Sequence, residues 1–117
     1  PVYPTERGLR PGAGSIVIAL EAASGVVPVS IGKPAPYLLE AAAHAVGREP
    51  SEAIMIGDGI ATDLAAARAV HARCVLMLTG SNSRTDVARA REAGAAAYVT
   101  KDRIAAQLIE AIRELAA

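Results

Sequence analysis

Apolar residues follow two patterns along this chain: short continuous runs and longer stretches with helical spacing. The short runs are rich in β-branched residues, which is typical of strands buried on both faces. They predict a strand or extended segment at residues 26–31 and strands at residues 53–56, 74–78 and 96–100. The longer stretches predict helices at residues 16–23, 36–46, 62–71, 86–92 and 104–115. Residues 1–12 are rich in proline and glycine and predict a loop.

This alternation of helices and strands predicts an α/β fold. Short crossovers between strands favour a mostly parallel sheet of about four strands, with helices on both faces in a three-layer arrangement. The length of 117 residues fits one domain, which we predict to span residues 1–117.

Composition and charge exclude several classes of partner. The 12 basic and 12 acidic residues balance, and the chain has no Phe or Trp, so neither a nucleic-acid nor a membrane-surface partner is predicted. No apolar run reaches the length of a membrane span. The single cysteine, Cys74, lies within an apolar strand and predicts a buried thiol in a reducing, cytoplasmic compartment.

Two carboxylates follow the predicted strand at residues 53–56. Asp58 comes after a glycine at the strand tip, and Asp63 opens the next predicted helix. In open α/β sheets ligands bind outside the carboxyl ends of the strands, and carboxylate oxygens suit Mg²⁺ with a phosphate. Lys33 precedes another predicted helix, where a lysine and a helix N-terminus together form an anion site. In the alternative interpretation Asp58 is a plain turn aspartate, Asp63 only complements the helix dipole, and Lys33 is an exposed loop lysine.

The order of short motifs from residue 4 to residue 80 resembles the C-terminal half of haloacid-dehalogenase-like (HAD) phosphatases, in the branch of nucleotide, glycerol-phosphate and p-nitrophenyl phosphatases. The matching motifs are Pro4-Thr5-Glu6-Arg7-Gly8, Pro11-Gly12-Ala13-Gly14, Gly32-Lys33-Pro34-Ala35-Pro36, Gly57-Asp58 with Thr62-Asp63, and Leu76-Met77-Leu78-Thr79-Gly80. The resemblance implies Mg²⁺-dependent hydrolysis of a phosphorylated small molecule. It implies that Lys33 contacts the phosphoryl group, that Asp58 is a catalytic metal ligand and that Asp63 supports the metal.

The chain departs from this family in two places. The family's nucleophile lies in an Asp-x-Asp motif, which does not occur in these 117 residues, so we expect weak or no hydrolysis by them alone. His71 follows Val70 where the family usually has Ala-Gly, and we predict it to be a helix C-terminus residue.

The last third, residues 81–117, resembles the end of a response-regulator receiver domain. The matching features are the strand ending at Thr79, Glu92-Ala93-Gly94-Ala95, Tyr98-Val99-Thr100-Lys101 and the closing helix with Leu108-Ile109. This resemblance implies that Thr79 and Lys101 bind a phosphoryl group; otherwise they are a turn residue and a strand-end charge. It makes a non-enzymatic receiver-like or scaffold domain, natural or chimeric, the alternative to the phosphatase.

In both look-alike folds the strands ending at Asp58, Thr79 and Lys101 lie side by side. Crossovers of one hand then place their connecting helices on one face of the sheet. The other face must be covered by the first and last helices or by a second copy of the chain. We therefore predict a homodimer.

Overall fold

A computed structural model describes residues 2–78 and 84–117 of the chain. Its contacts divide the chain into two compact units, Pro1–Ser30 and Ile31–Ala117. This division differs from the single domain predicted for residues 1–117. The boundary falls within residues 26–31, where the predicted strand is absent: this segment is exposed and has no regular secondary structure. No described strand pairs with it, so its backbone gains no sheet hydrogen bonds.

The first unit contains a β-hairpin and a helix. Strands β1 (Val2–Thr5) and β2 (Gly8–Pro11) pair antiparallel where a loop was predicted. The turn forms because Gly8 adopts a φ of 101° and the Thr5 hydroxyl donates a 2.7 Å hydrogen bond to the Gly8 carbonyl. Helix α1 (Ala13–Ser24) contains the predicted helix and has no buried residue. It ends at Gly25, which has a φ of 69°.

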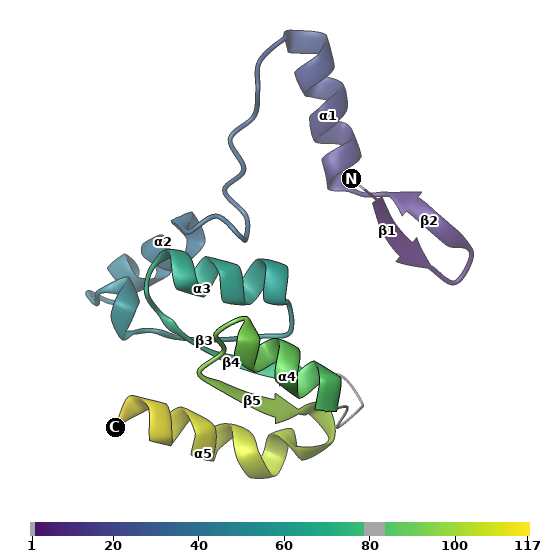
Figure 1. The fold of residues 1–117 in the computed structure, drawn as a ribbon. Coiled ribbons are helices and arrows are strands. Elements are labelled where there is room, and N and C mark those ends of the chain that lie inside the picture. The colour runs from purple at the N-terminus through teal and green to yellow at the C-terminus, as the bar shows by residue number, and fades with distance from the viewer. Residues whose placement is uncertain (1, 79–83) are drawn as a thin grey trace. The chain divides into compact units, whose positions relative to one another are not determined.

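The second unit is built on a parallel sheet of three strands in the order β3–β4–β5 (Figure 1). These are β3 (Ile54–Gly57), β4 (Arg73–Leu78) and β5 (Ala97–Thr100). The register places Gly57 beside Leu76 and Leu78 beside Thr100, so the carboxyl ends of all three strands lie at one edge. The α/β class and the parallel sheet are confirmed. The sheet has three described strands, because the predicted strand at residues 26–31 does not join it.

Helices cover both faces of this sheet, as predicted. Helices α3 (Ala65–Ala69) and α4 (Arg84–Glu92) pack on one face, and α5 (Ile104–Ala116) contacts all three strands from the other (Figure 1). Helix α2 (Tyr37–Ala45) leads through a short 3-10 turn, Pro50–Glu52, into β3. No described helix is both long and apolar enough to cross a membrane.

The core lies in the central strand. Cys74, Val75 and Leu76 of β4 are at most 1% exposed. Cys74 packs against Leu64 and Ala67, and Leu76 packs against α4. Because side chains alternate along a strand, Val75 faces the opposite layer, which contains α5. A central strand buried on both faces holds the neighbouring strand tips in a fixed register.

His71 has the predicted position after a helix. Helix α3 ends at Ala69, and His71 adopts a left-handed φ of 57° two residues later. Its N–H donates to the carbonyl of Arg68 at 3.1 Å. His71 therefore adopts the left-handed backbone conformation that a glycine commonly adopts after a helix C-terminus.

Candidate functional site

The tip of β3 leads into a tight turn that returns the chain toward the strand. Asp58 and Gly59 follow the strand, and Ile60–Leu64 form a π-helical turn before α3. The N–H groups of Asp63 and Leu64 both donate to the carbonyl of Gly59, at 2.9 and 3.1 Å. We predicted an α-helix at residues 62–71. The structure instead has a wider, π-helical turn, because the Gly59 carbonyl accepts both of these bonds. No side chain caps this turn.

The carboxylate of Asp63 holds this turn together. Its Oδ2 accepts the N–H of Asp58 at 3.2 Å and the N–H of Gly59 at 2.9 Å. The side chain is only 7% exposed. Burial raises the pKa of Asp63, but the hydrogen bond from Lys33, the two backbone N–H groups and the Lys33 charge together outweigh burial and lower it. Asp63 is therefore a buried carboxylate that stays ionised.

Lys33 reaches Asp63 from a distant part of the chain. It lies in the segment before α2, and its Nζ is 2.5 Å from Oδ1 of Asp63. The lysine side chain is 42% exposed, so its ammonium is held by a buried carboxylate yet open to solvent. This pair ties the segment before α2 to the tip of β3.

Two glycines make the close approach of Asp63 sterically allowed. A Cβ on Gly57 would overlap the carboxyl group of Asp63, with Oδ2 at 2.6 Å. A Cβ on Gly59 would overlap the Thr62 hydroxyl. A glycine at position 57 is therefore required by the packing of Asp63 against its own turn, and a glycine at position 59 leaves room for the Thr62 side chain.

Asp58 points into a different environment. Its side chain is 58% exposed, and its Oδ2 lies 3.0 Å from Nζ of Lys101. Lys101 begins a 3-10 turn, Lys101–Arg103, directly after β5. No described residue donates to the second carboxylate oxygen, so this oxygen is open to solvent or a ligand. The sheet register brings the two residues together although they are 43 positions apart.

A hollow of about 510 Å³ lies beside Asp58. Its lining comes from the turn after β3, from β4 and from α4: Asp58, Gly59, Ile60, Ala61, Thr62, Leu76, Met77, Asp86 and Arg89. No sequence motif signals the position of Arg89 in this lining. Its guanidinium is 4.0 Å from the Asp86 carboxylate, so the lining of the hollow includes an ion pair as well as Asp58.

The structure thus places four predicted residues in one linked group. Lys33 contacts Asp63, Asp63 contacts the backbone of Asp58, and Asp58 contacts Lys101. The fifth predicted residue, Thr79, lies outside the described residues. We refer to Lys33, Asp58, Asp63 and Lys101 as the strand-tip cluster.

The oxygen donors of this cluster fit a hard divalent cation only in part. The described residues contain no group of three or more His, Cys, Asp or Glu that could enclose a metal. Asp58 offers exposed carboxylate oxygen, whereas the Asp63 carboxylate is taken up by three donors. Mg²⁺ keeps several waters and is commonly bound through one or two carboxylates plus a substrate phosphate. The donor set therefore fits Mg²⁺ held jointly with a phosphate.

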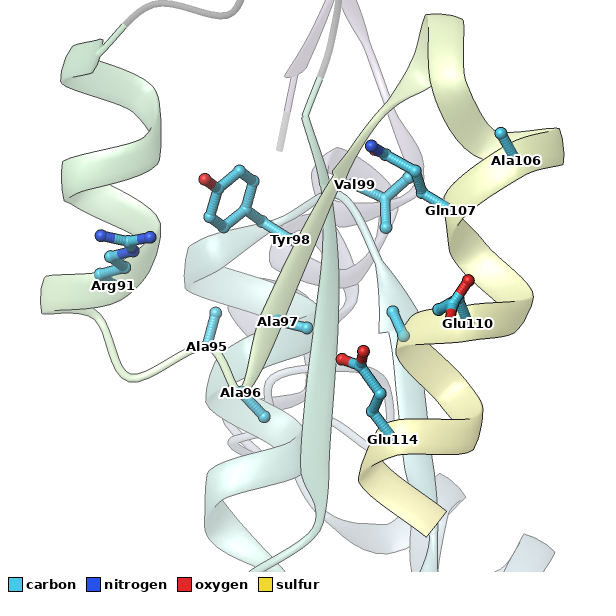
Figure 2. A pocket seen from close by; sticks show the side chains of 11 residues that line it. Arg91, Ala95, Ala96, Ala97, Tyr98, Val99, Ala106, Gln107, Glu110 and Glu114 are labelled. Atoms are coloured by element: carbon cyan, nitrogen blue, oxygen red, sulfur yellow. The ribbon is translucent and has the colours of Figure 1, made fainter. Parts of the chain in front are cut away.

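A second hollow of about 510 Å³ runs along β5 and α5, away from the strand tips. Figure 2 shows Glu110 and Glu114 on α5 and the Tyr98 ring on the opposite side of β5. The Arg91 guanidinium carbon lies 5.6 Å from the centre of this ring, a cation–π distance. This contact joins α4 to β5, which is a structural role.

Cys74 is a core residue, as predicted. Its side chain is buried in β4, and burial together with the charge of Asp63 raises its pKa to about 11. A thiol in this state is a poor nucleophile, so Cys74 is excluded from the chemistry of the site.

A protein-family model described as HAD-hydrolase-like matches residues 30–109, which contain the whole strand-tip cluster. The chain belongs to this HAD-like hydrolase family. The predicted resemblance is confirmed. The match continues well into residues 81–117 and gives no support to a receiver-like or chimeric C-terminal part.

Relatives by sequence include proteins named as phosphatases and as a 5′-nucleotidase. The chain is 42% identical over 103 residues to D-glycerol 3-phosphate phosphatase of Mycobacterium tuberculosis, covering 87% of this chain and 28% of that protein. It is 43% identical over 81 residues to the 5′-nucleotidase YutF of Bacillus subtilis, covering 69% of this chain and 32% of that protein. The chain thus spans about a third of the length of these HAD relatives.

Solved structures of HAD phosphatases have the same fold. The p-nitrophenyl phosphatase of Archaeoglobus fulgidus aligns with a TM-score of 0.64 at 33% identity, over 86% of this chain and 40% of its own. The glycerol phosphate phosphatase of M. tuberculosis, solved in complex with magnesium, aligns with a TM-score of 0.63 at 38% identity, over 86% of this chain and 30% of its own.

Proposed function

We propose that this chain supplies the metal- and phosphate-binding part of a Mg²⁺-dependent HAD phosphatase that acts on small phosphomonoesters. The observation that carries the proposal is the strand-tip cluster, in which two carboxylates and two ammonium groups meet at the carboxyl edge of a parallel sheet. Relatives named for glycerol phosphate and nucleotides support a phosphorylated small molecule as the substrate.

The residues have distinct roles in this proposal. Asp58 provides the carboxylate that holds Mg²⁺, because it is the exposed acid at the strand tip. Asp63 supports the metal indirectly by fixing the backbone of Asp58 and Gly59. Lys33, with its half-exposed ammonium, contacts the phosphoryl group, and Thr79 and Lys101 are proposed as further phosphate-binding residues.

Phosphoryl transfer depends mainly on positioning and on neutralising the charge of the phosphoryl oxygens. When bound, Mg²⁺ would supply a double positive charge at Asp58. The chain's own residues fix the backbone at this carboxylate through Asp63 and add one ammonium group at each of the two aspartates. The 117 residues contain no Asp-x-Asp, so the proposal assigns the nucleophile to none of them. The predicted homodimer and cytoplasmic location remain predictions.

Binding of Mg²⁺ and inorganic phosphate, measured by isothermal titration calorimetry, tests this function. We expect Mg²⁺ to bind and to strengthen phosphate binding, because the cation and the phosphate share the site. Asp58→Asn is expected to weaken Mg²⁺ binding by roughly tenfold or more, as loss of metal-site carboxylates commonly does.

Asp102→Asn is the matched control. Asp102 is an exposed acid in the turn that contains Lys101, and this substitution removes the same charge as Asp58→Asn. It is expected to leave Mg²⁺ binding close to that of the unaltered chain. Equal effects of the two substitutions, or no Mg²⁺ binding by the unaltered chain, would contradict the proposed role of Asp58.

A further inference from the structure

The chain has only two lysines, Lys33 and Lys101, and both lie in the strand-tip cluster. Each contacts one of the two aspartates: Lys33 contacts Asp63 at 2.5 Å and Lys101 contacts Asp58 at 3.0 Å. The other ten basic residues are arginines, since the chain has twelve lysines and arginines in total. Compact, strongly hydrated ammonium groups therefore occur only at this site.

The pair between Lys33 and Asp63 is a fixed part of the fold. The Asp63 side chain is 7% exposed and accepts two backbone N–H groups in addition to the lysine. Removing the lysine would leave a buried carboxylate without its only charged partner among the described residues. A cation that displaced Lys33 would have to lose its own water to enter this buried site, where both carboxylate oxygens already accept hydrogen bonds, so displacement of Lys33 is not expected.

The pair between Lys101 and Asp58 is exposed to solvent and is not a fixed part of the fold. The two side chains are 39% and 58% exposed, and Asp58 accepts no other hydrogen bond from the described residues. An exposed ion pair contributes little to stability, because water solvates both partners when they separate. A divalent cation at Asp58 would compete directly with this ammonium.

We propose that Lys101 is an exchangeable counter-ion for Asp58. It neutralises and positions this carboxylate in the metal-free protein, and Mg²⁺ displaces it when the metal binds. The proposal deepens the proposed function and rests on its assignment of Asp58 as the metal-holding carboxylate.

The charges of the cluster agree with such an exchange. Two ammonium groups balance two carboxylates when no ligand is present. Adding Mg²⁺ and a phosphate of nearly two negative charges leaves the sum close to zero. The displaced ammonium of Lys101 is then free to contact phosphate oxygens, so metal and phosphate binding are linked through this one side chain.

Lysine acetylation read by mass spectrometry tests the exchange directly, because the chain offers only two lysine side chains. The protein is treated with acetic anhydride in MgCl₂ and, separately, in EDTA with KCl of the same ionic strength. We expect Mg²⁺ to raise the acetylation rate of Lys101 severalfold and to leave that of Lys33 nearly unchanged. Equal changes at both lysines, or a Lys101 rate that does not respond to bound Mg²⁺, would overturn the proposal.

Lys101→Met gives a second, independent readout. Mn²⁺ serves as the probe, and free Mn²⁺ is measured by electron paramagnetic resonance. Removing the competing ammonium is expected to tighten Mn²⁺ binding by roughly threefold to tenfold. With Mn²⁺ saturating, the same variant is expected to bind inorganic phosphate more weakly.

Arg103→Met is the matched control, because Arg103 is an exposed cation in the same 3-10 turn. It is expected to change Mn²⁺ affinity much less than Lys101→Met does. Equal effects of the two substitutions would mean that Lys101 acts only through its long-range charge, and would overturn the proposal. If Mn²⁺ binding is absent or unaffected by Asp58→Asn, the proposed function fails and the exchange fails with it. If binding depends on Asp58 but not on Lys101, only the exchange fails.

Discussion

Two aspartates five positions apart have opposite environments in this protein. Asp63 is buried and accepts hydrogen bonds from three donors, whereas Asp58 is exposed and contacts a single lysine. The buried Asp63 fixes the backbone at Asp58 and Gly59 and so positions the exposed Asp58 side chain. An acid that must bind and release a ligand is best left exposed, while the acid that positions it is best held by several donors.

The environment of Asp63 predicts how stability depends on pH. Its pKa is lower in the folded protein than its ordinary value of 3.8, so folding favours the ionised form. This contribution is fully present above the ordinary value and is lost as pH falls through the lower, folded pKa. Below about pH 4 the free energy of unfolding should therefore decrease as Asp63 takes up a proton.

Urea unfolding between about pH 7 and about pH 3, in EDTA, measures this effect. Asp63→Asn is expected to lower the free energy of unfolding by about 1–3 kcal/mol near neutral pH and to make its dependence on pH less steep in acid. Asp102→Asn serves as the exposed control and should retain the steep acid dependence. An Asp63→Asn variant as stable and as acid-sensitive as the unaltered chain would contradict the assigned role.

At the level of elements, the join between β3 and the following turn depends on Gly57. A Cβ at this position would overlap the carboxyl group of Asp63, which itself holds the turn. Gly57→Ala is therefore expected to lower the free energy of unfolding by about 2 kcal/mol or more, since either the turn or Asp63 must move. It should also weaken Mg²⁺ binding by displacing Asp58.

Gly32→Ala is the control, because nothing lies within 4 Å of a Cβ built there. Its effect on the free energy of unfolding should stay within about 0.5 kcal/mol. Thermal unfolding and calorimetric titration with Mg²⁺ compare the two variants. Similar stabilities would show that the turn adapts and that the close packing of Asp63 is not required.

The predicted elements of the second unit agree with the structure because their signals are local. Apolar runs fixed β3, β4 and β5 to within about a residue or two, as parallel strands buried on both faces are apolar throughout. The clustering of Asp58 and Lys101 followed from parallel strand order and from the resemblance. The wide turn at residues 60–64 was missed, because it depends on close packing at two glycines rather than on residue preference.

The elements of the first unit were predicted less well. The hairpin at residues 2–11 has a proline in each strand and a short turn, so its sequence is close to that of a loop. The apolar residues at 26–31 predicted a strand, but a strand forms only where another strand supplies hydrogen bonds. Helix α1 was predicted correctly, although none of its residues is buried, because helical hydrogen bonds are internal to the segment.

At the scale of the whole molecule, the reasoning behind the predicted homodimer changes. We predicted that the face of the sheet away from the crossover helices needs either the terminal helices or a second copy. In the structure α5 contacts β3, β4 and β5, and Val75 in the centre of the sheet is fully buried. The C-terminal helix thus covers this face, so a second copy is not needed there. The dimer remains a prediction without this support.

The division into two units predicts that the second unit carries the site alone. Lys33, Asp58, Asp63 and Lys101 all lie between residues 31 and 117, and so does every buried apolar side chain in the described chain. A chain of residues 31–117 is expected to unfold cooperatively and to bind Mg²⁺ with an affinity within about twofold of the full chain, since it retains all four cluster residues and the contacts among them.

Circular dichroism during heating and calorimetric titration of both chains with MgCl₂ measure this. Asp58→Asn introduced into the shorter chain provides the control, and it should weaken Mg²⁺ binding as much as it does in the full chain. A shorter chain that is folded but binds Mg²⁺ much more weakly would mean that residues 1–30 contribute to the site. A shorter chain that fails to fold would mean that the two units depend on each other for stability.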